Sequence, residues 1–106
     1  MHARQVTLQL KPSMVNEFPV VFEKEILPLL RKQKGFVDEL VLITPEHREV
    51  VAISLWETKE NAVAYQRETY PRIEMIINRL VDGIPIVKLY ETEYSTFHKI
   101  TYAATA

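Results

Sequence analysis

The chain has no cysteine, only two glycines and a single tryptophan among its 106 residues. Without cysteine it can form no disulfide scaffold, perform no thiol chemistry and bind no zinc through thiolates. Two glycines are too few for a glycine-rich phosphate loop. No apolar run reaches the roughly 18 residues of a membrane-spanning helix. Thirteen basic residues are interleaved with fourteen acidic ones, so the net charge of −1 offers no attraction for nucleic acid. We therefore expect neither a membrane nor a nucleic-acid partner.

The composition that remains is typical of a globular protein, with 47% hydrophobic and 25% charged residues. We expect one domain over residues 1–106, with a core at about 5–97 and a tail at 98–106 that is loosely ordered or docks on a neighbour. The N-terminal sequence enters a strand pattern at once and lacks the long apolar core of a signal peptide. A cytoplasmic location is therefore expected.

The clearest pattern is a strand followed by a helix in the middle of the chain. Apolar residues occupy both the odd and the even positions of the segment from Val50 to Trp56. Because these positions point to opposite faces, the pattern is typical of a strand covered on both faces. One face carries Val51, Ile53 and Leu55, and the other carries Val50, Ala52, Ser54 and Trp56. After the candidate N-cap Thr58, apolar residues recur at helical spacing as far as Leu80. Pro71 is expected to break or kink this helix just after Tyr70.

The other elements predicted are a strand at 5–11, a helix within 14–34, a strand at 36–44, a turn at 45–48 and a strand at 85–97. In the first helix Asn16 is the favoured N-cap, although Ser13 could start an irregular turn earlier. Pro28 should cause a kink because it cannot bond to the Lys24 carbonyl. Asp82 and Gly83 are expected to stop the second helix.

The order β-α-β-β-α-β predicts an α+β, ferredoxin-like sandwich, in which two helices cover one face of a four-stranded antiparallel sheet. No helix remains for the other face, although the second and third strands are apolar on both faces. A second copy of the chain could cover that surface, so we expect a homodimer that packs through the sheet face.

Two segments resemble the antibiotic biosynthesis monooxygenase family of dimeric α/β barrels. They are Leu27–Phe36, LPLLRKQKGF, and Ser54–Ala62, SLWETKENA, and their spacing also matches. The resemblance covers about 8–97 of the chain. It implies a cofactor-independent, monooxygenase-like protein that acts on a small aromatic phenol or quinol and uses no metal or other cofactor. The alternative is a non-catalytic dimeric module that binds a small hydrophobic molecule or a protein. Haem degradation, also known in the family, is disfavoured because the second helix contains no histidine.

A substrate pocket is expected between the sheet and the helices, where the resemblance places Trp56 in its wall. Ser54 on the same face is small enough to leave room for a flat ligand, and Phe22 and Tyr70 are further candidates for substrate binding. The alternative is that Ser54 lets a helix pack closely and that Trp56 fills the edge of the core.

Tyr65 and His98 are the candidates for moving a proton. The hydroxyls of Tyr65 and Tyr70 could hydrogen-bond a phenol, although aromatic residues at helical spacing more often belong to the core. His98 is the one histidine placed to act as a general base, because His2 is terminal and His47 lies in a turn. A structural or dimer-contact role for His98 is the alternative. No histidine has the spacing of a metal ligand, so no metal site is expected.

Overall fold

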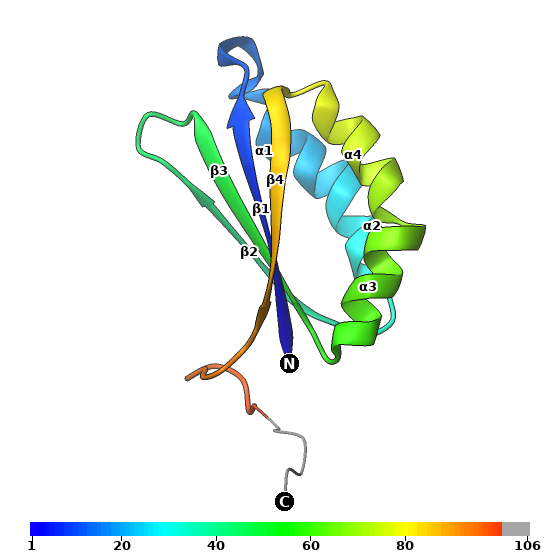
Figure 1. Cartoon of the computed structure of the whole chain (residues 1–106). Coiled ribbons are helices and arrows are strands. Elements are labelled where there is room, and N and C mark those ends of the chain that lie inside the picture. Colours follow the sequence, from blue (N-terminus) through cyan, green and yellow to red (C-terminus); the bar gives the residue numbers. More distant parts are fainter. Residues whose placement is uncertain (101–106) are drawn as a thin grey trace, which may run out of the picture.

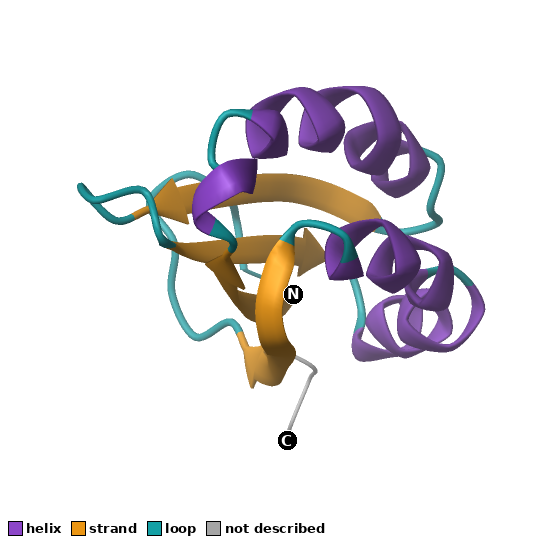
Figure 2. Ribbon diagram, turned by 90° about the horizontal axis from the view of Figure 1, so that it is seen from above, coloured by secondary structure: helices purple, strands orange, loops and turns teal. Residues whose placement is uncertain are grey.

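Four strands form one antiparallel sheet in the order β2-β3-β1-β4 (Figure 1). The computed structural model describes residues 1–100. The strands are β1 (His2–Leu10), β2 (Phe36–Ile43), β3 (Glu49–Trp56) and β4 (Val81–Glu91). Helices cover one face of this sheet, as Figure 2 shows from above. The predicted ferredoxin-like α+β fold is therefore confirmed. Among the described residues, no helix is long and apolar enough to cross a membrane.

The first helical segment is interrupted where its internal proline requires it. It consists of the 3-10 turn η1 (Pro12–Met14), α1 (Glu17–Val21), the π-helical turn η2 (Phe22–Ile26) and α2 (Leu27–Arg31). Pro28 has no N–H for the Lys24 carbonyl, and the turn before it widens so that the Leu27 N–H bonds to the Phe22 oxygen. The irregularity predicted at Pro28 thus takes the form of a π turn. Asn16 precedes α1 as predicted, but its side chain makes no capping hydrogen bond.

The second helical segment is two helices, α3 (Lys59–Glu68) and α4 (Tyr70–Asn78). Thr58 caps α3, because its hydroxyl accepts a hydrogen bond from the Asn61 N–H at 3.0 Å. The break falls at Thr69, one residue before the predicted position, and places Pro71 in the first turn of α4, where a proline is tolerated.

The predicted stop at Asp82-Gly83 is wrong, because β4 already begins at Val81 and runs through both residues. The pairing of β1 with β4 shifts register between Thr7 and Gln9, and Gly83 there has a φ of 74°. Gly83 thus allows a β-bulge rather than ending a helix. β4 ends at Glu91, not at the predicted residue 97. Of the predicted tail, residues 101–106 lie outside the described part.

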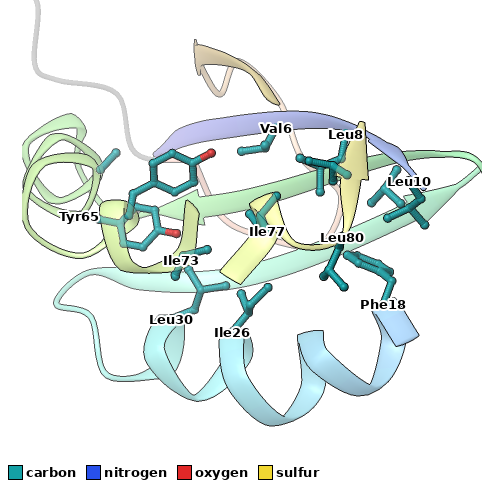
Figure 3. Packing of buried hydrophobic residues seen from close by; sticks show 14 of the residues in the cluster. Val6, Leu8, Leu10, Phe18, Ile26, Leu30, Tyr65, Ile73, Ile77 and Leu80 are labelled. Atoms are coloured by element: carbon teal, nitrogen blue, oxygen red, sulfur yellow. The ribbon is translucent and has the colours of Figure 1, made fainter. Parts of the chain in front are cut away.

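The two faces of the sheet have different surroundings. The face under the helices carries the core, which Figure 3 shows from close by. It includes Val6, Leu8, Leu10, Phe18, Ile26, Leu30, Ile73, Ile77 and Leu80. The open face leaves large side chains exposed, among them Leu40, Leu42, Ile86 and Tyr90. In β2 a bulge at Val37 shifts the register, so Glu39 points toward the helices and Asp38 toward the open face.

Candidate functional site

A small cavity lies between the helices and the sheet. Its volume of about 30 Å³ holds a water molecule but not an aromatic ring. Its apolar lining comes from Val6, Leu8, Phe18, Phe22, Ile26, Leu30, Ala52, Ile73 and Ile77, and its polar lining from Arg4, Glu39, Ser54, Tyr65 and Tyr70. Four of the candidates named from sequence, Phe22, Ser54, Tyr65 and Tyr70, therefore meet around one space.

Trp56 does not reach this cavity. Its side chain is completely buried and stacks on the Tyr65 ring, with 4.8 Å between the ring centroids. Phe36 packs edge-on against its other side at 5.7 Å. The indole Nε1–H donates to Ser54 Oγ at 2.8 Å, which satisfies its only polar group. Trp56 therefore supports Tyr65 and Ser54 from behind, as a core residue.

Arg4 is the most unusual residue in the cavity wall, because its charged side chain is only 2% exposed. Its Nε and Nη2 both donate to Gln66 Oε1 of α3, at 2.9 and 2.5 Å. The guanidinium carbon lies 4.0 Å from the centroid of the Tyr70 ring and 5.2 Å from that of Tyr65. Among residues 1–100 no carboxylate forms an ion pair with it. A neutral amide and two aromatic rings thus hold a buried positive charge without neutralising it.

Glu39 lies in the same wall and does not neutralise Arg4 either. Its Oε1 is buried and has no hydrogen-bond partner among the described residues. Burial raises the pKa of Glu39 from its ordinary value of 4.5 to about 8, against the lowering effect of the Arg4 charge. The side chain is therefore a neutral carboxylic acid at pH 7.

The two tyrosines complete a set of hydrogen-bond donors. Burial raises the pKa of Tyr65 and of Tyr70 above the ordinary value, although the Arg4 charge opposes the shift, so both hydroxyls keep their protons. The Tyr70 hydroxyl is buried and has no hydrogen-bond partner within residues 1–100. Unused donors on Arg4, Glu39 and Tyr70 at one small cavity with a net positive charge suit a ligand with a negatively charged oxygen.

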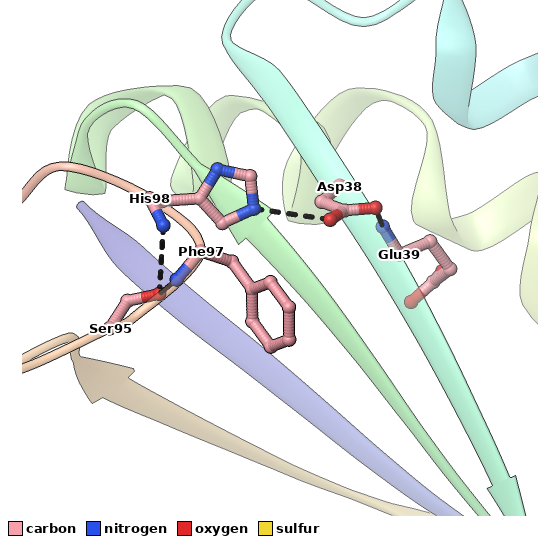
Figure 4. A network of polar contacts seen from close by, with 5 residues as sticks. All are labelled: Asp38, Glu39, Ser95, Phe97 and His98. Atoms are coloured by element: carbon pink, nitrogen blue, oxygen red, sulfur yellow. Dashed lines mark hydrogen bonds and ion pairs between the residues drawn. The ribbon is translucent and has the colours of Figure 1, made fainter.

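His98 is not part of this arrangement. It lies over the open face of the sheet, where its Nε2 is 3.1 Å from Asp38 Oδ2 (Figure 4). This pair borders a surface groove of about 420 Å³ together with Glu39, Leu40, Ile53, Leu55, Ser95 and Phe97. Within one chain, β2 and β3 therefore separate His98 from Tyr65, and the two candidates for proton transfer are not brought together. Within residues 1–100 no three acidic or histidine side chains are clustered as metal ligands would be.

Arg4 and Glu39 were not identified from the sequence. Arg4 lies on the same face of β1 as Val6 and Leu8, because the strand begins at His2. A predicted strand that began at His2 instead of residue 5 would have placed Arg4 on the buried face. Glu39 alternates with Val41 on the inner face, but the bulge before it hides that phase. A charged residue in phase with buried neighbours is the signal that could have found both.

Comparison with known proteins confirms the fold. No protein-family model matches the chain, and no curated protein matches its sequence. Its structure is similar to a monooxygenase from the gene ActVA-Orf6 of Streptomyces coelicolor, solved with the ligand nanaomycin D (TM-score 0.75, 13% identity, 92% of each chain covered). SnoaB, a cofactor-independent oxygenase from Streptomyces nogalater, gives a TM-score of 0.73 at 16% identity over 90% of this chain and 95% of that one.

A protein of unknown function from Nitrosomonas europaea is equally similar, with a TM-score of 0.75 at 16% identity over 96% of this chain and 95% of that one. At such low identity the likeness concerns the fold alone. The chain thus has the ferredoxin-like fold of proteins named antibiotic biosynthesis monooxygenases, as its sequence led us to expect.

Proposed function

We propose that the protein is a cofactor-independent, monooxygenase-like enzyme that binds a small phenol or quinol as its anion beside Arg4. The observation that carries this proposal is the buried guanidinium, which has unused donors and no ion-pair partner within residues 1–100. The likeness to the oxygenase of Streptomyces nogalater agrees with it.

The chemistry needs little from the protein beyond the anion site. An electron-rich phenolate can pass an electron to dioxygen, and the resulting ring radical and superoxide combine at a ring carbon. Loss of water then leaves one oxygen atom of dioxygen on the ring, as a quinone carbonyl, and releases the other in water. Arg4 would stabilise the phenolate, the hydroxyl of Tyr70 would donate to its oxygen, and the apolar wall would exclude water.

The assembly that we propose is a homodimer through the open face of the sheet. Leu40, Leu42, Ile86 and Tyr90 are 46–59% exposed on this face, where a second copy would bury them. A specific interface would bury on the order of 800 Å² per subunit.

A non-catalytic binding module is the second candidate, because the cavity of about 30 Å³ must enlarge before a phenol fits. Oxygen uptake with a panel of phenols and hydroquinones, measured in the presence of a metal chelator, separates the two functions. We expect uptake with the wild type, loss with Arg4→Met, and no change with Glu46→Gln, which alters the exposed turn between β2 and β3. Ligand-induced thermal stabilisation without any oxygen uptake would favour the binding module. Melting curves of each variant check that it is folded.

A further inference from the structure

Glu39 occupies a boundary position in the fold. It lines the internal cavity with Arg4, and it also lines a surface groove of about 300 Å³ between the first helical segment and β2. The groove is lined by Phe22, Leu27, Arg31, Phe36, Val37, Asp38, Glu39 and Val41. Phe22 and Glu39 are common to both spaces, so a displacement of these two side chains would join the groove to the cavity. β2 is an edge strand of the sheet, so no other strand of residues 1–100 covers this side.

The charges around Glu39 come from several elements. Arg4 of β1 lies across the cavity, and Tyr65 of α3 and Tyr70 of α4 share that wall. Arg31 of α2 borders the groove together with Asp38, whose carboxylate also lies 3.1 Å from His98 Nε2. The negative charge of Asp38 adds to the rise in the pKa of Glu39. Burial outweighs the attraction of Arg4, so the pKa of Glu39 is about 8. Its proton is therefore available for donation at neutral pH.

We propose that the carboxyl of Glu39, which lines the cavity with Arg4 and whose buried Oε1 has no partner within residues 1–100, donates a hydrogen bond to the ligand oxyanion that Arg4 holds, and that the groove beside it is the entrance to this site. The ligand class, a small phenol, rests on the proposed function. The charges favour a monoanion, because Arg4 and one phenolate sum to zero while Glu39 remains neutral. If Glu39 were ionised, the same complex would carry an uncompensated negative charge in a buried space.

The proposal fixes the pH dependence of binding. Below pH 8 the site is ready for a phenolate, and its affinity for that anion is constant. Above about pH 8 Glu39 loses the donated proton and repels the anion, so the affinity should fall about tenfold for each further pH unit. A general base would show the opposite behaviour, because it must be ionised to accept the proton of a phenol.

The test uses 4-nitrophenol, whose phenolate absorbs visible light and whose neutral form does not. The wild type should bind it as the phenolate, even at a pH where the free compound is mostly neutral. Glu39→Gln keeps an N–H donor and cannot titrate, so its phenolate affinity should match that of the wild type at pH 6 and stay constant to pH 9. Glu39→Met has no donor, and its affinity should be roughly tenfold to a hundredfold weaker. Circular dichroism verifies the fold of each variant.

Several outcomes would overturn the proposal. These are no binding by the wild type, binding of the neutral phenol, equal pH profiles for wild type and Glu39→Gln, or equal affinities for the Gln and Met variants. The assay measures binding alone. If 4-nitrophenol binds as described while no phenol consumes oxygen, the proposed oxygenase function fails and the anion site stands.

Discussion

Replacing Glu39 with glutamine should change how the stability of the protein depends on pH. In the folded chain Glu39 keeps its proton up to a pH of about 8, whereas in the unfolded chain it ionises near its ordinary value of 4.5. Between these values the unfolded state has lost a proton that the folded state retains. Rising pH therefore favours unfolding, and above about pH 8 both states are ionised and the effect no longer grows.

The size of this effect follows from the two pKa values. Each pH unit within the interval lowers the free energy of unfolding by about 1.4 kcal/mol. Over the interval of about 3.5 pH units the loss sums to about 5 kcal/mol, which is a large fraction of the stability of a small domain. Glu39→Gln keeps the shape of the side chain and has no proton to lose, so it escapes this loss.

Urea unfolding of both proteins at pH 5, 6, 7 and 8 measures the difference directly. The wild type should lose stability relative to Glu39→Gln at every step, and all other ionising groups cancel because both proteins carry them. Glu46→Gln is a matched control, since its carboxylate is exposed in the turn between β2 and β3 and its loss should leave the pH slope of the wild type intact. Parallel curves for wild type and Glu39→Gln would refute the reasoning, because they would mean that Glu39 ionises alike in both states.

Three further outcomes are expected. Ile53→Glu on the open face should give a monomer by light scattering at micromolar concentration, whereas Val63→Glu on α3 should remain a dimer; a dimer in both cases contradicts the proposed interface. Ser54→Leu should cost roughly 2–5 kcal/mol in urea unfolding, because it overfills a cavity of about 30 Å³ and removes the acceptor of Trp56 Nε1; an unchanged midpoint would show that the site is roomier. Tyr70→Phe removes a buried hydroxyl without a partner in residues 1–100, so unfolding should change by less than about 0.5 kcal/mol while 4-nitrophenol binding weakens. Marked destabilisation would mean that the hydroxyl is bonded.

The sequence predicted the layered fold well because local and tertiary preferences agree there. Val6, Leu8 and Leu10 occupy every second position and so identify the inner face of β1. Pro28 and Pro71, which cannot donate a backbone hydrogen bond, predict where the two helical segments become irregular. Gly83 misled because glycine with a positive φ serves a helix end and a β-bulge equally well. Only the pairing of β4 with β1 distinguishes the two.

The polar end of the cavity could not be predicted in the same way. Charged side chains face solvent over most of the chain, but Arg4 and Glu39 do not follow this rule. The residues that cover them lie far away in the sequence, so no local pattern predicts their burial. Gln66, which bonds to Arg4, lies 62 positions away. The position of Trp56 behind Tyr65 likewise depends on how α3 rests on the sheet, so side-chain stacking decides it and strand parity does not.

The bulge at Val37 absorbs one residue of chain length at the polar end of the cavity. Phe36 pairs with Trp56 and Asp38 pairs with Leu55, so Val37 is the extra residue and Glu39, opposite Ser54, is turned inward after it. Loss of the Val37 codon would therefore regularise the strand and still leave the glutamate on the inner face and the aspartate on the outer one. A three-nucleotide deletion at this point should preserve the acid beside Arg4, whereas the loss of one residue within a regular strand turns every following side chain to the other face.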